Sequence, residues 1–429
     1  MAFADLPPPP PSNGPTGFWR HPVLWSVATL IAIAVFAGVF AGVEKVASAV
    51  ERNRAYQAKI APFYDPPPGF AAQPVGTVLR KEPMDVPVAG ARSYRILYRS
   101  EDSTGKATVS SGMVFVPTAP APAGGWPVLA WAHGTVGMGD SCAPSRSLTP
   151  EASFTWAAQA IRAGYVITAT DYAGLGTPGT EHYLVGGDEA RDVVNSVRAA
   201  REIGGTANSR WVVYGHSQGG HAALWTGTVA RTYAPELELT AVAAAAPAAE
   251  LAPLLRLQRS TAVAWIIGPE VAKAWPLVYP DLDVDAVLTS EGKRFGPGIA
   301  NRCIATTGAI EGLALQEIGG RYFARDPGSE PEWRRALAEQ TPPPLPADLP
   351  VLVGQGLADT VVLPPTTALL QERWCAAGSR LSVDWIGTLG HVPAGNAVGP
   401  LAVTDFEQRR AGIPAGSTCG TTLPVRPAR

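Results

Sequence analysis

The sequence predicts an α/β fold in which helices cover both faces of a mostly parallel β-sheet, with a helical cap inserted into it. Short apolar segments alternate with longer helical stretches along most of the chain, which is the pattern of strands joined by crossover helices. Such strands are short and apolar because both faces of a parallel sheet are buried. One interval, 253–346, separates two of the strands by far more than an ordinary crossover. We interpret this interval as the cap; the alternative is a run of long surface loops.

The individual elements follow from residue type. Seven apolar or β-branched segments are expected to be strands: 107–117, 127–132, 164–170, 211–214, 239–246, 350–353 and 381–386. Four stretches between them are expected to be helices: 150–163, 188–203, 218–233 and 365–377. Within the cap, 332–339 has a helical pattern. Ligands of open α/β sheets bind beyond the carboxyl ends of the strands, so the residues that follow strands are the first candidates for a functional site.

Composition limits the class of protein. The chain has 429 residues, of which 46% are hydrophobic, enough to build a large core and to exclude wholesale disorder. It carries 34 basic and 36 acidic side chains, so there is no basic excess to neutralise phosphates, and we expect no nucleic-acid partner. No linker or repeat interrupts residues 62–429, which we expect to fold as one domain. The sequence leaves the oligomeric state open.

The first sixty residues differ from the rest. The head, 1–22, contains five consecutive prolines at 7–11 and is expected to be disordered. Residues 23–43 carry no charge and are long enough to cross a bilayer as one helix. The small residues at 47–49 offer a cleavage site, so the apolar segment is either an uncleaved signal anchor or the core of a cleaved signal. Residues 44–61 are expected to be a linker.

The four cysteines bear on location and metal binding. Cys142, Cys303, Cys375 and Cys419 form no C-x-x-C pair and lie near no histidine at ligand spacing, so we expect no metal site. Their even number suits two disulfides in an oxidising compartment; the alternative is four free thiols in the cytosol. Basic residues after the apolar segment favour a cytoplasmic domain, but long domains can translocate despite such charge. We expect an extracytoplasmic protein, anchored in the membrane by its N-terminal segment or secreted.

A nucleophile is predicted at Ser217. The pentapeptide Gly-His-Ser-Gln-Gly at 215–219 follows the strand 211–214 and precedes a helix, which is the strand-turn-helix setting of the G-x-S-x-G motif. The motif places its serine on a sharp, strained turn, where side chains on the flanking glycines would crowd it. The turn also places the hydroxyl at a helix N-terminus, which favours developing negative charge. The alternative is an ordinary glycine-rich turn.

A base and an orienting acid are found by elimination. Among six histidines, only His391 follows the cap, and its glycine-flanked position after a strand suggests a mobile loop that reaches the serine. His216, beside the serine, is expected to point elsewhere. In this arrangement the acid lies between serine and histidine in the chain, and Asp359, just past a strand, fits best. Asp384 is a poorer choice because it lies within a strand.

The oxyanion hole is predicted from two strand ends. His133, Gly134 and Thr135 follow a strand, where a His-Gly step commonly supplies one backbone N–H; we prefer that of Thr135, with Gly134 allowing close approach. The second donor is the residue after the nucleophile, Gln218. The alternative is an ordinary glycine turn. The segment 171–176, at another strand end, either forms part of the pocket wall or serves only as a turn.

Several short motifs together resemble the secretory lipase family. They are Gly-His-Ser-Gln-Gly-Gly at 215–220, Asp-Tyr-Ala-Gly-Leu-Gly at 171–176, Cys-Ala-Pro-Ser at 142–145 and Pro-Phe-Tyr-Asp-Pro-Pro at 62–67. The resemblance covers the chain from about residue 62 to its end. It implies an α/β-hydrolase fold with a helical lid. It also implies two disulfides, Cys142–Cys303 and Cys375–Cys419.

The resemblance further implies the chemistry. Ser217, Asp359 and His391 occupy the positions of a Ser-Asp-His triad that acts on carboxylic esters, including acylglycerols. We therefore expect a lipase or esterase that hydrolyses a lipid or small ester through an acyl-enzyme, without a cofactor. Two alternatives remain: an acyltransferase that uses the same triad, and a non-catalytic binding protein on a hydrolase scaffold.

Overall fold

The structure, a computed structural model, describes residues 48–150, 154–205 and 207–429. The expected disordered head and the apolar segment 23–43 lie outside the described residues. The chain divides into two compact units, 1–59 and 60–429; of the first, the described residues are helical. Every helix in the described part of the chain is too short or too polar to cross a bilayer.

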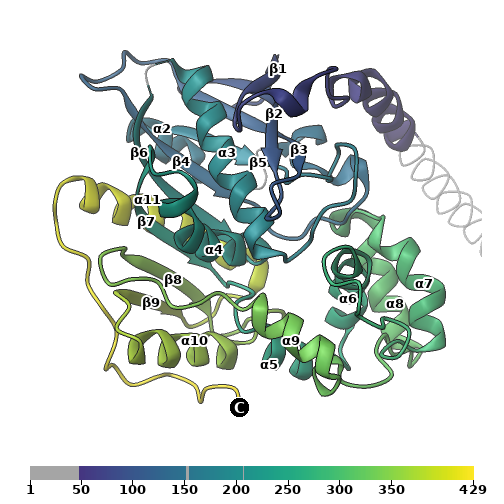
Figure 1. Cartoon of the computed structure of the whole chain (residues 1–429). Helices are drawn as coiled ribbons and strands as arrows, with labels where there is room; N and C mark the ends of the chain where they lie inside the picture. The colour runs from purple at the N-terminus through teal and green to yellow at the C-terminus, as the bar shows by residue number, and fades with distance from the viewer. Residues whose placement is uncertain (1–47, 151–153, 206) are drawn as a thin grey trace, which may run out of the picture. The chain divides into compact units, whose positions relative to one another are not determined.

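One nine-stranded sheet organises residues 60–429 (Figure 1). In spatial order its strands are β1 (Val78–Met84), β2 (Ala91–Glu101), β3 (Ala107–Pro117), β5 (Val166–Thr170), β4 (Trp126–Ala132), β6 (Ala207–His216), β7 (Glu238–Ala245), β8 (Val351–Gly356) and β9 (Leu381–Ile386). The first three strands pair antiparallel, and β3 pairs antiparallel with β5. From β5 to β9 all pairs are parallel. The predicted mostly parallel sheet is confirmed, and each of the seven expected strands is present.

Helices cover both faces of the sheet. Three helices pack on one face: α3 (Gly186–Gly204), α4 (Gln218–Tyr233) and α10 (Pro364–Ala376). Two pack on the other: α2 (Ala157–Arg162) and α11 (His391–Arg410). Alternation along the strands explains the two layers, because Val213 of β6 lies in the first core whereas its neighbours Val212 and Tyr214 lie in the second. The helix expected at 150–163 is shorter than predicted, and α11 was not predicted.

The interval between β7 and β8 is largely helical. It contains α5 (Leu251–Gln258), α6 (Ala262–Ala274), α7 (Ser290–Ala300), α8 (Ala309–Glu317) and α9 (Pro331–Glu339). Trp265, Trp275, Tyr322 and Trp333 of this interval belong to a third apolar cluster, which also includes Tyr183 and Leu184 from the loop before α3. We call this helical interval the cap. Figure 1 shows α6, α7 and α8 grouped to one side of the sheet.

Two disulfides link segments that are distant in the sequence. Cys142 is joined to Cys303, which connects the loop after β4 to the cap, and Cys375 is joined to Cys419, which ties α10 to the C-terminal segment. Both predicted pairs are confirmed, so none of the four cysteines is free.

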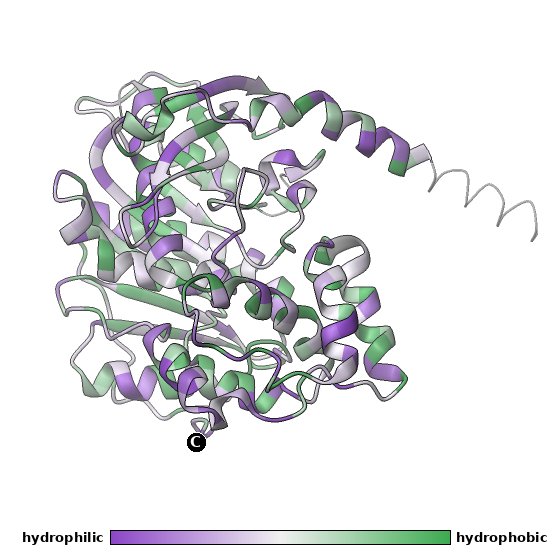
Figure 2. Ribbon diagram, turned by 45° about the vertical axis from the view of Figure 1, so that its right-hand side comes forward, coloured by the Kyte–Doolittle hydropathy of each residue, from purple (hydrophilic) through white to green (hydrophobic). Residues whose placement is uncertain are grey.

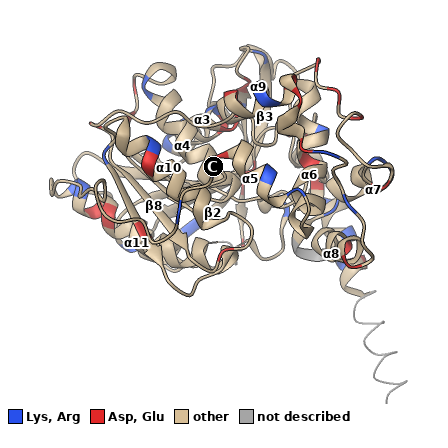
Figure 3. Ribbon diagram, turned by 90° about the horizontal axis from the view of Figure 1, so that it is seen from below, with Lys and Arg blue, Asp and Glu red and all other residues tan. Residues whose placement is uncertain are grey.

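Hydropathy and charge follow this architecture. Figure 2 shows hydrophobic residues concentrated along the strands and mixed colours on the surrounding helices. In Figure 3, Lys, Arg, Asp and Glu form small separate groups on helices and loops, and most of the chain is uncharged. The low charged fraction, 16%, therefore reflects in part a sheet that is buried on both faces.

Candidate active site

Ser217 lies on a strained turn between β6 and α4. Its backbone is at φ 59° and ψ −118°, a conformation that costs free energy for a residue with a Cβ. The neighbouring glycines leave no room for side chains: a Cβ on Gly215 would lie 1.9 Å from the Gly219 carbonyl oxygen, and one on Gly219 would lie 1.9 Å from that of Ala132. The N–H of Ser217 donates to the carbonyl of Ala245 at 2.9 Å. The sheet thus fixes the turn and leaves the hydroxyl available.

The structure brings Ser217, His391 and Asp359 together. The His391 Nε2 atom lies 2.9 Å from the Ser217 hydroxyl oxygen, and His391 Nδ1 lies 2.8 Å from Asp359 Oδ2. The three side chains come from the ends of β6, β8 and β9, strands that share one carboxyl edge. With Nδ1–H bound to a carboxylate, Nε2 is free to accept the serine proton.

The Asp359 carboxylate is buried and held in place by its own loop. Its Oδ1 atom accepts hydrogen bonds from the N–H groups of Val361 and Val362, at 2.8 and 3.0 Å. The amide of Gln355 donates to Oδ2 at 3.3 Å. These hydrogen bonds fix the carboxylate in the position from which Oδ2 orients His391.

The setting of His391 differs from what we predicted. Instead of lying within a mobile loop, it is the first residue of α11, and only 387–390 form the connection from β9. His216, expected to point elsewhere, contacts it directly: His216 Nε2–H donates to the His391 carbonyl at 3.0 Å, and the ring centroids are 4.7 Å apart. Burial, together with the nearby His391, lowers the pKa of His216 to about 3, so this second histidine is a neutral support for the first.

The predicted oxyanion residues surround the same serine. A Cβ on Gly134 would lie 3.3 Å from the Ser217 Cβ and 3.1 Å from the His216 carbonyl oxygen, so glycine permits this close approach. The Thr135 hydroxyl is hydrogen-bonded to the Tyr183 hydroxyl at 2.8 Å. Gln218 is the first residue of α4, where backbone N–H groups have no partner within the helix. The Gln218 side chain donates hydrogen bonds to two buried residues, Glu181 and Glu189.

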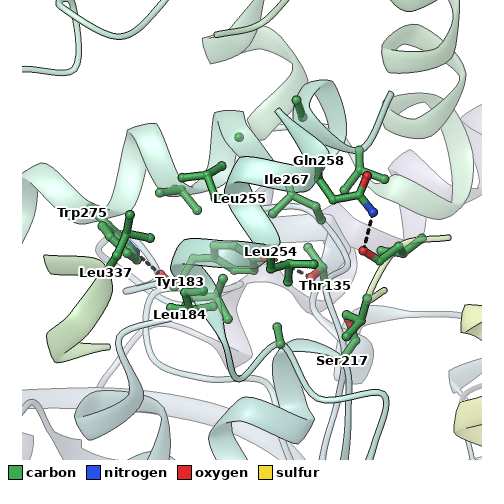
Figure 4. Close-up of a pocket in the computed structure, with 18 of the residues that line it drawn as sticks. Thr135, Tyr183, Leu184, Ser217, Leu254, Leu255, Gln258, Ile267, Trp275 and Leu337 are labelled. Atoms are coloured by element: carbon green, nitrogen blue, oxygen red, sulfur yellow. Dashed lines mark hydrogen bonds between the residues drawn. The ribbon is translucent and has the colours of Figure 1, made fainter. Parts of the chain in front are cut away.

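An apolar cavity opens beside Ser217 (Figure 4). Its volume is about 700 Å³ with the open space at its mouth, and the cap supplies most of its wall. Figure 4 places Ser217 and Thr135 on one side and Trp275 and Leu337 on the opposite side. The remaining lining includes Tyr183, Leu184, Leu251, Leu254, Leu255, Val263, Ile267 and Val271. Such a lining accommodates a hydrocarbon chain with one end at the serine.

The segment 171–176 and His133, which also follow strands, lie outside the cavity and are held by hydrogen bonds within the fold. The segment 171–176 contributes nothing to the cavity lining; Asp171 is buried and accepts hydrogen bonds from Ser111 and Ser145. His133 is also buried, with Nδ1 2.7 Å from the carbonyl of Gly134. In the described ranges, no group of three or more His, Cys, Asp and Glu residues is placed to hold a metal ion. Sequence reasoning missed the polar network behind Gln218, because no motif marks its members.

Comparisons with known proteins identify the family of this chain. A sequence model of the secretory lipase family matches residues 143–418, which is more than half of the chain. The secreted triacylglycerol lipase LIP2 of Malassezia globosa is 26% identical over 368 residues, covering 78% of this chain and 76% of the relative. A probable inactive lipase, MT1628 of Mycobacterium tuberculosis, is 24% identical over 82% of both chains.

A solved structure supports the fold. Candida antarctica lipase A in its closed state superposes with a TM-score of 0.67 at 18% identity, over 85% of this chain and 89% of the other. At that identity the likeness concerns the fold alone, and it confirms an α/β-hydrolase architecture. Because the family match spans the nucleophile turn, the whole cap and the positions of Asp359 and His391, the chain belongs to the secretory lipase family.

Proposed function

We propose that this protein is a serine carboxylic ester hydrolase that cleaves acylglycerols or related lipid esters through an acyl-enzyme. The observation that carries the proposal is the hydrogen-bonded series Asp359–His391–Ser217 at the mouth of an apolar cavity. The family membership supports the same reaction, as do relatives described as triacylglycerol lipases.

The reaction follows from the positions of these groups. His391 Nε2 takes the proton of Ser217 as the hydroxyl attacks the ester carbonyl, and it then protonates the departing alcohol. Asp359 holds the Nδ1–H and stabilises the imidazolium. The backbone N–H groups of Gln218 and Thr135 are the proposed donors to the oxyanion. A water activated by His391 then releases the acid, and the acyl chain occupies the cavity under the cap throughout.

Replacement of Ser217 tests the proposal. Ser217→Ala should abolish hydrolysis of a short p-nitrophenyl ester, because it removes the hydroxyl that lies against His391 Nε2. Ser260→Ala is the matched control, since this exposed cap serine lies outside the cavity lining and should retain full activity. Hydrolysis that survives in Ser217→Ala would overturn the proposal. Product analysis with a competing alcohol separates hydrolysis from acyl transfer.

We also propose that the protein acts outside the cytoplasm. The two disulfides support this location, because such bonds persist in oxidising compartments. Anchoring through residues 23–43 remains part of the proposal and rests on the uncharged sequence alone. Fractionation of the producing cells tests it: an anchored protein sediments with membranes and is released by detergent, whereas recovery of the processed chain from the medium would overturn the anchor.

A further inference from the structure

Two buried carboxyl groups hold the side chain of Gln218, the residue that follows the nucleophile. Gln218 Nε2 donates to Glu181 Oε1 at 2.6 Å and to Glu189 Oε1 at 2.8 Å. All three side chains are almost fully buried. Glu181 lies in the loop before α3, and Glu189 lies in the first turn of α3, so two separate elements converge on the start of α4.

This arrangement requires a proton. An amide nitrogen has two hydrogens in a fixed planar fork, so the two accepting oxygens lie within about 5 Å of each other. Two carboxylates cannot both remain ionised at that separation in a buried site, because neither burial nor a single neutral amide compensates their repulsion. One of the two carboxyl groups therefore keeps its proton.

Glu189 has two further polar neighbours, and the proton lies on Glu181. The Glu189 Oε1 atom also accepts the N–H of Leu184 at 3.0 Å, and the Glu189 Oε2 atom lies 3.1 Å from His221 Nδ1. Glu181 carries the proton of the pair: burial, followed by the charge of Glu189, raises its pKa to about 8.

Other charged groups near Glu181 act in opposing directions. Asp192 raises the pKa of Glu181 further, whereas Lys273 of the cap lowers it. Glu270, also of the cap, is fully buried, and its own pKa is raised by burial and by Glu181. His182 lies beside Glu181 in the chain and is paired with Asp188. The balance around Glu181 is acidic, which favours the neutral form of this carboxyl.

The network continues into the end of the cap. His221 Nε2 donates to the carbonyl of Gln340 at 2.7 Å. The Gln340 side chain accepts the N–H of Gly186 at 2.8 Å and donates to the Tyr279 hydroxyl at 2.6 Å. A continuous set of hydrogen bonds thus joins the first turn of α4, the start of α3 and the residue that ends α9.

We propose that Glu181 and Glu189 are positioning residues for ester hydrolysis, because they hold the Gln218 side chain and thereby aim its backbone N–H at the oxyanion. This inference rests on the proposed function. When Glu181 loses its proton at alkaline pH, two anions face one amide group and the hold on Gln218 weakens. The consequence is a loss of transition-state stabilisation, so kcat falls while KM, which depends on the separate apolar cavity, changes little.

The test is the pH dependence of kcat and KM for a short p-nitrophenyl ester, measured on the full chain. For the wild-type protein we expect kcat to fall with an apparent pKa near 8, where Glu181 ionises. Glu181→Gln keeps an acceptor but cannot ionise. It should therefore retain neutral activity within about threefold and move the alkaline fall by at least about one pH unit. Asp405→Asn, which removes a partly buried carboxyl on α11 that faces Arg409, is the control and should leave the profile unchanged.

A second pair of variants separates positioning from folding. Glu189→Leu removes one of the two acceptors of the Gln218 amide. It should lower kcat by about 10- to 100-fold, up to the loss seen when an oxyanion donor is removed. Glu189→Gln should recover most of the activity, because its amide can accept from Gln218 and donate to His221 Nδ1. Rates are divided by the fraction of protein that a fluorophosphonate labels, so unfolded protein does not count.

Three outcomes would overturn the inference. One is an alkaline fall that is identical in the wild type and Glu181→Gln; another is a kcat per labelled site in Glu189→Leu equal to that of the wild type. A wild-type protein without ester hydrolysis at any pH would overturn the proposed function itself, and this inference with it. The first two outcomes leave the proposed function standing, so the two failures are distinguishable.

Discussion

Shortening Trp275 should lengthen the acyl chain that the enzyme prefers. This side chain lies on the side of the cavity opposite Ser217 (Figure 4) and is almost fully buried. Its indole N–H donates to the Tyr183 carbonyl at 3.1 Å, and its ring stacks on that of Trp333 with centroids 5.8 Å apart. Because the ring is held at two points, it is a fixed wall that an acyl chain cannot push aside.

The size of the effect follows from the burial of hydrocarbon. Each methylene that gains a buried position contributes about 0.8 kcal/mol, or roughly fourfold in kcat/KM. Trp275→Ala removes nine ring atoms and should accommodate about four more methylenes, so kcat/KM for the longer esters should rise by up to about 200-fold. Deletion of a buried tryptophan also lowers the free energy of unfolding by about 3–5 kcal/mol, so assays belong well below the unfolding transition.

A p-nitrophenyl ester series from acetate to palmitate provides the assay. Trp275→Ala should shift the optimum to longer chains and leave acetate hydrolysis within about twofold, because that substrate does not reach the wall. Trp275→Phe, which retains a ring, should shift it less. An unchanged optimum in an active Trp275→Ala protein would refute the view that the acyl chain runs from Ser217 to Trp275.

Three further predictions concern the scaffold. Replacing Cys142 and Cys303 with serine opens a link across 161 residues; it should lower the free energy of unfolding by up to about 5 kcal/mol, and an unchanged melting temperature in calorimetry would contradict this. Gly219→Ala should abolish fluorophosphonate labelling, because its Cβ would meet the Ala132 carbonyl at 1.9 Å; normal labelling would show that the turn can adjust. Burial raises the pKa of Glu181 from 4.5 to about 8, so between these pH values the folded protein holds a proton that the unfolded chain has lost. The free energy of unfolding should therefore fall as pH rises through this interval, by up to about 5 kcal/mol in all. Urea unfolding at pH 5.5 and 8.5 should show the part of this loss that falls above pH 5.5, roughly 3 kcal/mol in the wild type, and a much smaller loss in Glu181→Gln; equal losses would contradict it.

The buried parallel strands could be predicted because burial on both faces leaves an uninterrupted apolar run. β1 and β2 could not, since they carry several charged residues at the antiparallel edge of the sheet and so show no such run. The helix α11 was missed for a different reason: it contains Gly395, Gly399 and Pro400, which disfavour helices in isolation. A Cβ on Gly399 would lie 2.2 Å from the Trp156 ring, and one on Gly395 would lie 2.8 Å from the His216 ring. Tertiary packing requires these glycines and overrides the local propensity.

The candidate site also contains residues that the sequence could identify and residues that it could not. Ser217 is marked by a local motif, and His391 and Asp359 follow from their order in the chain, so sequence alone could single them out. The disulfide pairing came from family resemblance, because four cysteines allow three pairings. Glu181, Glu189 and His221 carry no local mark of their role. Only the fold brings the start of α3 against the start of α4, and this contact turns ordinary polar residues into a support for Gln218.

The central claim is that Ser217 is a nucleophile activated by His391. The most direct measurement is fluorophosphonate labelling of the native protein, followed by peptide mass spectrometry. We predict one equivalent of label on Ser217, none after denaturation, and a labelling rate in His391→Ala reduced by at least about 1,000-fold. Label on a different residue, no label at all, or an unchanged rate in His391→Ala would contradict the account.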